Sequence, residues 1–171
     1  GIIQEAAWTG PGTYLRKKIE QYQLDKVTNH GRVWRLRFDG IPGVPAMGSA
    51  PARAAVPAIE FFDRLPAKLV AEFQAVLEAV AEAPPPAFSG GGKWEAMHDE
   101  MAGFYEVRIQ GGGMNHRLFC VLERDAADLG GSSIVVIDGL SKPKRSAADP
   151  KDYRRARAMR DEFLRRRTVL E

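Results

Sequence analysis

Cysteine is almost absent from this sequence, which contains only Cys120 among its 171 residues. A single cysteine cannot form a disulfide within the chain, and such a composition is typical of proteins in a reducing cytosol. Because Cys120 lies within the apolar run 118–122, we predict a buried and unreactive thiol.

Long apolar runs are missing as well. No stretch approaches the roughly 18 apolar residues that a membrane-spanning helix needs. Residues 1–5 show no basic region followed by an apolar core, so they do not have the pattern of a secretory signal. We therefore expect a soluble, cytoplasmic protein with no membrane partner.

A strong net charge is also lacking, but the charge is unevenly placed. The chain as a whole carries a formal charge of +3. Residues 141–171 hold eleven Lys and Arg against five Asp and Glu. This distribution predicts a basic surface at the C-terminal end of the chain.

The composition, with 44% hydrophobic and 27% charged residues, is that of a globular protein with a single core. Residues 1–30 contain a Gly-Pro-Gly turn and a short predicted helix over 13–23, and we interpret them as an N-terminal appendage. Residues 31–171 are then the main domain, for which periodicity predicts the order β, α, α, β, β, β, α.

The first half of this domain is predicted to contain one strand and two helices. Alternating residues predict a strand over 32–38, and the Gly- and Pro-rich segment 39–52 predicts a loop. One helix is expected to begin at Pro57 and a second at Pro66, the second with an apolar stripe that should pack on a sheet.

The second half is predicted to be a meander followed by a helix. Residues 93–98 are interpreted as an irregular or helical link. A helix over 150–167 closes the chain, with Asp149 as its cap. The three strands between them, joined by short turns and therefore antiparallel, are expected at residues 104–110, 115–123 and 132–138.

Two of these strands each carry an arginine. Arg108 and Arg117 converge on one face when the strands pair, an arrangement that suits a phosphate-bearing substrate. The alternative for both residues is a structural salt bridge on the sheet. His116 precedes Arg117 and is therefore predicted to point to the opposite face.

A basic loop is predicted where the third strand ends. It contains Lys142, Lys144 and Arg145, which we interpret as an RNA-binding cluster, although solvated charge is the ordinary role of such residues. Lys144 is also a candidate general base.

Three stretches in this half of the chain resemble one known family. They are residues 106–109 (EVRI), 116–119 (HRLF) and 135–143 (VVIDGLSKP). In this order they are similar to the phage-derived HigB-like branch of the RelE/ParE toxin superfamily, whose members carry W-E-L-R and Y-R-V-L-Y type strands, then an apolar strand with a G-F-x-K-K type turn. The turn here reads Ser-Lys-Pro-Lys, and the Asp-Tyr-His cluster of some HigB toxins is missing. The resemblance covers residues 32–167.

The resemblance implies an α+β fold of the RelE type, a small curved antiparallel sheet with an N-terminal helical hairpin and a C-terminal helix. It also implies the toxin of a type II toxin-antitoxin pair, an endoribonuclease that cuts mRNA, often on the ribosome. In the implied reaction the ribose 2′-hydroxyl attacks the adjacent phosphate, which needs a base, cations and an acid but no metal or other cofactor. The implied catalytic residues are Arg108, Arg117, Lys142, Lys144 and Tyr153, and the implied RNA-binding residues are Arg35, Arg37, Arg145, Arg154 and Arg157.

Other interpretations fit the same residues. Tyr153 has the helical position of a core contact, and His98 lies in an acidic segment typical of a surface. The superfamily also contains ParE proteins, which poison DNA gyrase and cut no RNA, and a non-catalytic RNA-binding or regulatory module would keep the same basic sheet.

The implied partners of a toxin are a cognate antitoxin of the helix-turn-helix type, mRNA and the ribosome. The arginines of the last helix are interpreted as a solvated face, or as a surface for RNA or for an acidic antitoxin.

Overall fold

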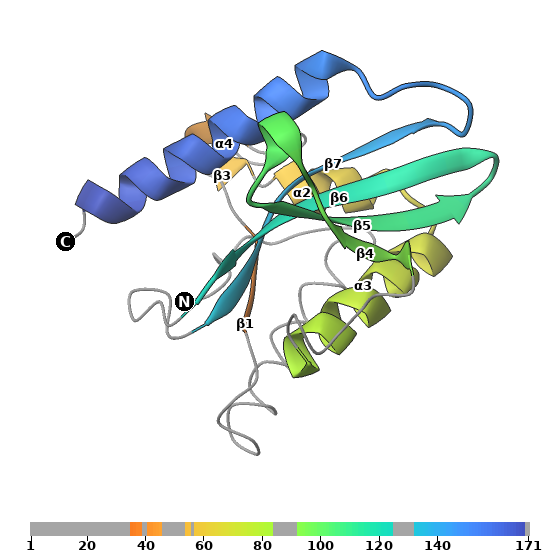
Figure 1. Cartoon of the computed structure of the whole chain (residues 1–171), viewed down its shortest axis with the longest axis horizontal. Coiled ribbons are helices and arrows are strands. Elements are labelled where there is room, and N and C mark those ends of the chain that lie inside the picture. The colour runs from red at the N-terminus through yellow and green to blue at the C-terminus, as the bar shows by residue number, and fades with distance from the viewer. Residues whose placement is uncertain are drawn as a thin grey trace.

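The computed structural model describes six segments of the chain (Figure 1). They are residues 35–38, 41–45, 54–55, 57–83, 92–124 and 132–169, with side chains described over 57–83, 92–124 and 132–165. The appendage predicted over 1–30, and the turn predicted to join the second and third strands of the meander, lie outside these residues.

A five-stranded sheet forms the centre of the fold, in the order β1-β7-β6-β5-β4. The four strands β4 to β7 are antiparallel, as expected for chain segments joined by short connections. The strands are β1 (Arg35–Phe38), β4 (Trp94–Ala96), β5 (Phe104–Gly111), β6 (Met114–Glu123) and β7 (Ser133–Pro143).

The expectation of an entirely antiparallel sheet is wrong at β1, which pairs in parallel with β7. Parallel neighbours need a long crossover connection, and here the chain between β1 and β7 contains two helices and three other strands of the sheet. The α+β class is confirmed, with one parallel edge added to an antiparallel sheet.

The hairpin between β5 and β6 turns at Gly112 and Gly113. Their φ angles of 60° and 76° lie in the left-handed region, which glycine adopts without steric cost. Two consecutive residues of this kind suit the tight turn of a right-twisted hairpin. The turn fixes the register that places Arg108 directly across from Arg117.

One face of the sheet is covered by the two predicted helices, α2 (Pro57–Asp63) and α3 (Ala67–Glu82). The apolar stripe of α3 is buried together with Phe61 and Phe62 of α2 against alternate residues of the strands. Gly139 of β7 permits this close approach, because a Cβ atom there would overlap the ring of Phe61. The prediction of two helices packed on a sheet is confirmed.

The opposite face is covered by α4 (Pro150–Val169), which lies across the sheet on the side away from α3 (Figure 1). Asp149 caps this helix, since its Oδ1 accepts a hydrogen bond of 2.9 Å from the backbone N–H of Lys151. Ala156 and Phe163 are buried in a second apolar cluster on this face, and Tyr153 packs against it.

Two predicted segments have a different structure. Within the predicted loop 39–52, β2 (Ile41–Pro45) forms a two-stranded sheet with β3 (Ala54–Ala55), where proline is tolerated because each strand has only one partner. Within the predicted link 93–98, residues 94–96 form β4, a strand too short to show a period in the sequence. Trp94 fixes it by stacking on Tyr105 at 5.0 Å between ring centroids.

Among the helices of the described segments, none is long and apolar enough to cross a membrane.

Candidate functional site

The convergence of Arg108 and Arg117 is confirmed, because the two residues are direct register partners on β5 and β6. Like charges directly opposite each other on a sheet repel and destabilise the pair of strands. A counter-charge is therefore required on the same face.

Glu106 supplies this counter-charge from two positions before Arg108 on the same strand. Its Oε1 accepts a hydrogen bond of 2.5 Å from Arg108 Nε and lies 2.5 Å from Arg108 Nη2. Its Oε2 lies 3.5 Å from Arg117 Nη1. Only 2% of Glu106 is exposed. A buried carboxylate is costly without cationic partners, so the two arginines and Glu106 stabilise each other.

A second carboxylate reaches Arg108 from the edge strand. Glu95 Oε2 of β4 lies 3.0 Å from Arg108 Nη1, and both side chains are almost half exposed, at 44% and 43%. Ion pairs at this exposure are screened by solvent and contribute little to stability. Arg108 is thus the accessible arginine of the group, and Arg117, at 18% exposure, is the more enclosed one.

Tyr153 of α4 closes the group from above the sheet. Its hydroxyl oxygen accepts a hydrogen bond of 3.1 Å from Arg117 Nη1. Its ring meets the ring of Phe119 edge to face, with centroids 5.8 Å apart. The prediction of a core contact is therefore confirmed for the ring of Tyr153, while a catalytic role for its hydroxyl, which contacts Arg117, stays a prediction.

A cavity of about 470 Å³, here called the polar cavity, is lined by the two arginines, Glu95, Glu106 and Tyr153 together with neighbouring residues. Its walls come from β4, β5, β6, the short 3-10 helix Asp99–Met101 and the start of α4. Two buried atoms of its lining, Arg117 Nε and Glu106 Oε2, have no hydrogen-bond partner within the described part of the chain. Buried polar atoms normally have a hydrogen-bond partner, so the ion pairs of this group leave part of its hydrogen-bonding capacity unused.

The lining is richer in acid than the sequence suggested. It contains four carboxylates, on Glu95, Asp99, Glu100 and Glu106, beside the two guanidinium groups. Glu106 is the buried lining residue of this candidate site that sequence reasoning missed. Its signal was the spacing of Glu106 and Arg108, which places a carboxylate and a guanidinium on one face of a strand.

The predicted basic loop begins later than expected, because β7 continues through Pro143. Lys142 is therefore a strand residue opposite Asn115, and its Nζ donates to the backbone oxygen of Ser146. Lys144 and Arg145 have exposed side chains in the turn that follows. None of these three lines the polar cavity. They form a separate basic surface, tied to the β5–β6 turn by the backbone bond from Lys144 N–H to Gly113 O.

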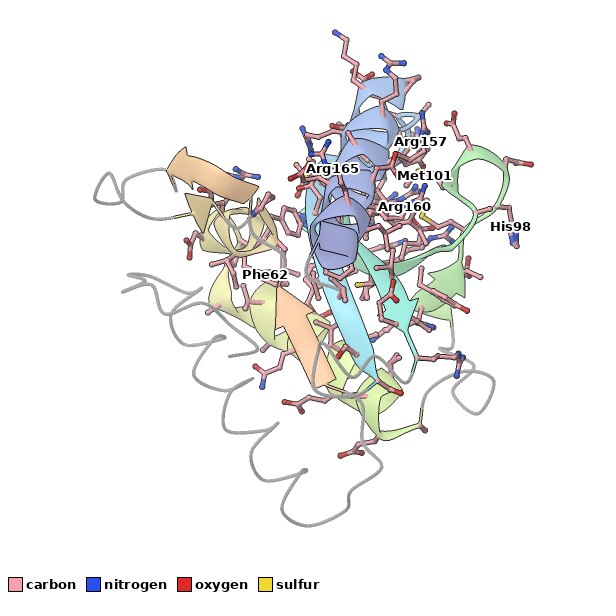
Figure 2. All side chains as sticks on the ribbon, turned by 90° about the vertical axis from the view of Figure 1, so that its left-hand side faces the viewer. Phe62, His98, Met101, Arg157, Arg160 and Arg165 are labelled. Atoms are coloured by element: carbon pink, nitrogen blue, oxygen red, sulfur yellow. The ribbon has the colours of Figure 1, made fainter. Side chains whose placement is uncertain are left out.

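The other predicted RNA-binding residues are dispersed. Arg35 and Arg37 lie on β1, at the sheet edge opposite β4, and their side chains lie outside the described residues. Arg154 is exposed on α4, whereas Arg157 Nη1 lies 3.4 Å from Glu100 Oε2. Figure 2 shows Arg157 on the side of α4 that faces the 3-10 helix.

Arg155 was not predicted as a site residue, and it anchors α4 to the sheet. Its Nε donates a hydrogen bond of 2.7 Å to Oδ2 of Asp138, which is buried on β7. Because this bond joins the first half of α4 to β7, it helps to hold Tyr153 in place over the polar cavity.

The remaining candidates lie as their sequence positions indicated. His98 is exposed, although it also lines the polar cavity. His116 faces the other side of the sheet, where it contacts Ser141. Cys120 is fully buried, and burial raises the pKa of its thiol well above the usual range, which keeps it protonated.

Chemically, the polar cavity combines a buried carboxylate, two guanidinium groups and a phenol hydroxyl. Such a set can accept a proton, hold an anion and donate a hydrogen bond within one space. Comparisons of the chain with protein-family models, curated proteins and solved structures found no match.

Proposed function

We propose that this chain is the toxin of a type II toxin-antitoxin pair, of the HigB-like branch of the RelE/ParE superfamily. In this proposal it is an endoribonuclease that cleaves mRNA, associated with the ribosome, by attack of the ribose 2′-hydroxyl and without a metal. The observation that carries the proposal is the grouping of Arg117, Glu106 and Tyr153 in the polar cavity.

Phosphate binding is assigned to Arg117 and Arg108. Guanidinium groups match the geometry of phosphate oxygens, and both arginines line the polar cavity. Arg108 is exposed enough to leave Glu95 and turn toward a substrate phosphate. The two cations then stabilise the extra negative charge of the pentacoordinate transition state.

Proton transfers are assigned to Glu106 and Tyr153. Substrate phosphate competes with Glu106 for the guanidinium groups, and the released carboxylate accepts the proton of the 2′-hydroxyl. The 2′-oxygen bonds to phosphorus while the bond to the 5′-oxygen breaks, and the Tyr153 hydroxyl protonates that leaving oxygen. The products are a 2′,3′-cyclic phosphate and a 5′-hydroxyl. Lys144 is the less suitable base, because its exposed side chain does not line the polar cavity.

The basic residues outside the cavity are assigned to the RNA backbone. Lys142, Lys144 and Arg145 lie beside the β5–β6 turn, and Arg154 is exposed on α4. Such contacts bind phosphates without regard to sequence and weaken as salt rises. The proposed partners are mRNA, the ribosome and a cognate antitoxin of the helix-turn-helix type, for which the basic surface is the expected docking face.

The test is induced expression in a bacterial host, with sequencing of new 5′-hydroxyl RNA ends. Wild-type protein is compared with Glu106→Gln and with Arg117→Ala/Lys142→Ala. The matched control is Arg64→Ala/Lys68→Ala, which also removes two positive charges but from exposed positions on the α2–α3 side. We expect growth arrest and cuts within translated messages for wild type and control, and neither for the two site variants.

Two outcomes would contradict the proposal, and each would favour a different function. Growth arrest without new RNA ends would indicate a ParE-like gyrase poison. RNA binding without cleavage or arrest would indicate a non-catalytic RNA-binding or regulatory module, an alternative favoured by the position of the exposed basic surface outside the polar cavity.

A further inference from the structure

A second polar group lies on the opposite face of the sheet, where His116 of β6 and Ser141 of β7 are register partners. His116 Nδ1 is 2.7 Å from Ser141 Oγ, and His116 Nε2 is 3.3 Å from the backbone oxygen of Gly111. A carbonyl oxygen only accepts, so Nε2 carries the ring proton of the neutral histidine. Nδ1 is then an acceptor, and the Ser141 hydroxyl donates to it.

A hydrogen bond donated by the serine hydroxyl to the histidine ring is the arrangement that activates a serine. A hydroxyl that donates to a neutral imidazole can transfer its proton to that imidazole as it attacks, provided that a third group orients the ring. Here the Gly111 carbonyl orients it. His116 is 6% exposed, which restricts its ring, whereas Ser141 is exposed and accessible to a substrate.

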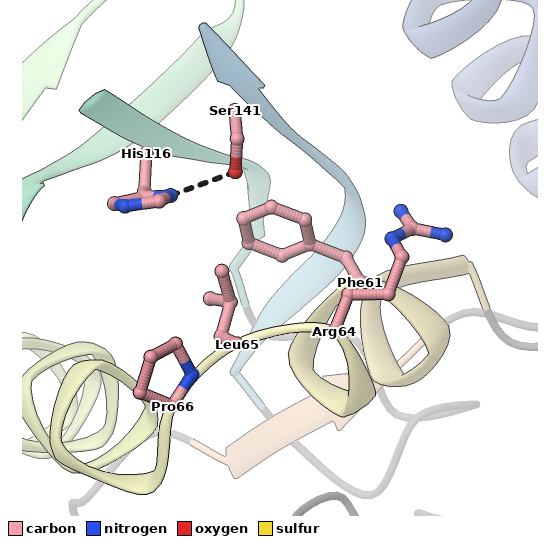
Figure 3. Close-up of a pocket in the computed structure, with 6 residues that line it drawn as sticks. All are labelled: Phe61, Arg64, Leu65, Pro66, His116 and Ser141. Carbon is pink, nitrogen blue, oxygen red and sulfur yellow. Dashed lines mark hydrogen bonds between the residues drawn. The ribbon is translucent and has the colours of Figure 1, made fainter. Parts of the chain in front are cut away.

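A cavity of about 430 Å³ adjoins the pair. Figure 3 shows Ser141 and His116 on one side of it, with Phe61, Leu65 and Pro66 across from them. Arg64, at the end of α2, is the charged residue of this lining within the described chain. The cavity therefore offers an apolar surface and one cation beside a polarised hydroxyl.

We propose that Ser141 and His116 form a nucleophile–base dyad that accepts acyl groups from carboxylic esters. Ser141 Oγ bonds to the ester carbonyl carbon, and its proton passes to His116 Nδ1. The bond from that carbon to the leaving oxygen breaks, and His116 returns the proton to the leaving alkoxide. Water then hydrolyses the acyl-serine by the same route, which releases the carboxylic acid and restores the hydroxyl.

The lining selects the class of ester. An apolar acyl chain fits against Phe61, Leu65 and Pro66, and an anionic group on the same substrate is held by Arg64. This activity is independent of the proposed ribonuclease, because the dyad and the polar cavity lie on different faces of the sheet.

Covalent labelling tests the dyad directly. The full-length protein is treated with an alkyl fluorophosphonate. Mass spectrometry then identifies each modified serine and measures the rate of its modification. Ser146 is an internal comparison, since it is exposed but its hydroxyl donates to the backbone oxygen of Pro143, which is not a base. We expect Ser141 to be labelled at least about a hundredfold faster than Ser146, and His116→Gln to remove that advantage, because general bases contribute about 10²–10⁴-fold.

Hydrolysis of 4-nitrophenyl butyrate gives a second readout. Ser141→Ala should reduce hydrolysis to the rate without protein, whereas the Ser146→Ala control should retain the wild-type rate and Ser141→Cys should retain acylation. Thermal unfolding of each variant verifies that the chain is folded. Equal labelling of Ser141 and Ser146 in folded wild-type protein, or unchanged hydrolysis by folded Ser141→Ala, would overturn the dyad. Neither result affects the outcome expected for RNA ends in the test of the proposed ribonuclease.

Discussion

Tyr153 and Arg117, 36 residues apart in the chain, are joined by a hydrogen bond of 3.1 Å from the guanidinium to the phenol oxygen. This bond links α4 to the strand that carries the most enclosed cation of the polar cavity. The last helix therefore contributes a hydroxyl group to the lining of this cavity in addition to its packing on the sheet.

The first prediction follows from this bond. Tyr153→Phe keeps the ring on Phe119 and removes the hydroxyl, so we expect a stability loss of about 1 kcal/mol. RNA cleavage should fall by about 10²–10⁴-fold if the hydroxyl protonates the leaving oxygen. Cleavage of a labelled RNA on translating ribosomes measures the effect. Tyr105→Phe is the matched control, because Tyr105 stacks on Trp94 at the other face; full cleavage by Tyr153→Phe would exclude the acid role.

The second prediction concerns the two carboxylates that contact Arg108. Glu106→Gln should destabilise the fold by about 2 kcal/mol, because it removes a buried, charge-assisted contact between two opposed cations. Glu95→Gln should cost less than about 1 kcal/mol, since that pair is almost half exposed. Urea unfolding curves of the two variants give both values. Equal losses would show that Glu106 does not hold the arginines together.

The third prediction tests the close approach of α2 to β7. Gly139→Ala places a methyl group into the ring of Phe61, and overpacking of this kind costs about 1–3 kcal/mol. The measurement is the shift of the thermal unfolding midpoint. Phe61→Leu in the same chain makes room, so the double variant should be more stable than the sum of the two single changes predicts. Strict additivity would contradict the contact.

The fourth prediction is a pH dependence of stability that arises from Cys120. Burial raises the pKa of this thiol in the folded protein, so the thiol stays neutral there while the unfolded chain ionises above pH about 8.5. Its contribution to stability is therefore complete below that pH and is lost as the pH rises. Between pH 7.5 and 9.5 we expect about 1.4 kcal/mol of loss that Cys120→Ala does not show. Urea unfolding at both pH values measures this difference, and an identical loss in the variant would indicate an accessible thiol.

Most helices and strands were predictable because their patterns are local. The two helices that begin near Pro57 and Pro66, and the cap at Asp149, follow from residues adjacent in sequence. The parallel pairing of β1 was not predictable, since it depends on a partner far along the chain. The three residues of β4 carry too little pattern, and Trp94 becomes informative only when its stacking on Tyr105 is seen.

The candidate site was predictable in its cations but not in its anions. Alternation along β5 and β6 correctly placed Arg108 and Arg117 together. Glu106 and Glu95 were overlooked because a search for phosphate ligands counts positive charge alone, whereas pairing of two cations on a sheet needs negative charge nearby. The His116–Ser141 contact depends on the length of β7, which extends beyond the end predicted from its apolar residues.

The parallel position of β1 also has a consequence for synthesis. The partner of Arg35 is Ser133, about a hundred residues later, so the ribosome needs about 5–20 s to produce it at 5–20 residues per second. Until then β1 presents an unpaired edge, and neither α4 nor the lid that Tyr153 forms over the polar cavity exists. A nascent chain of this protein therefore acquires its sheet edge and its complete cavity almost together, only after β7 and α4 have been synthesised.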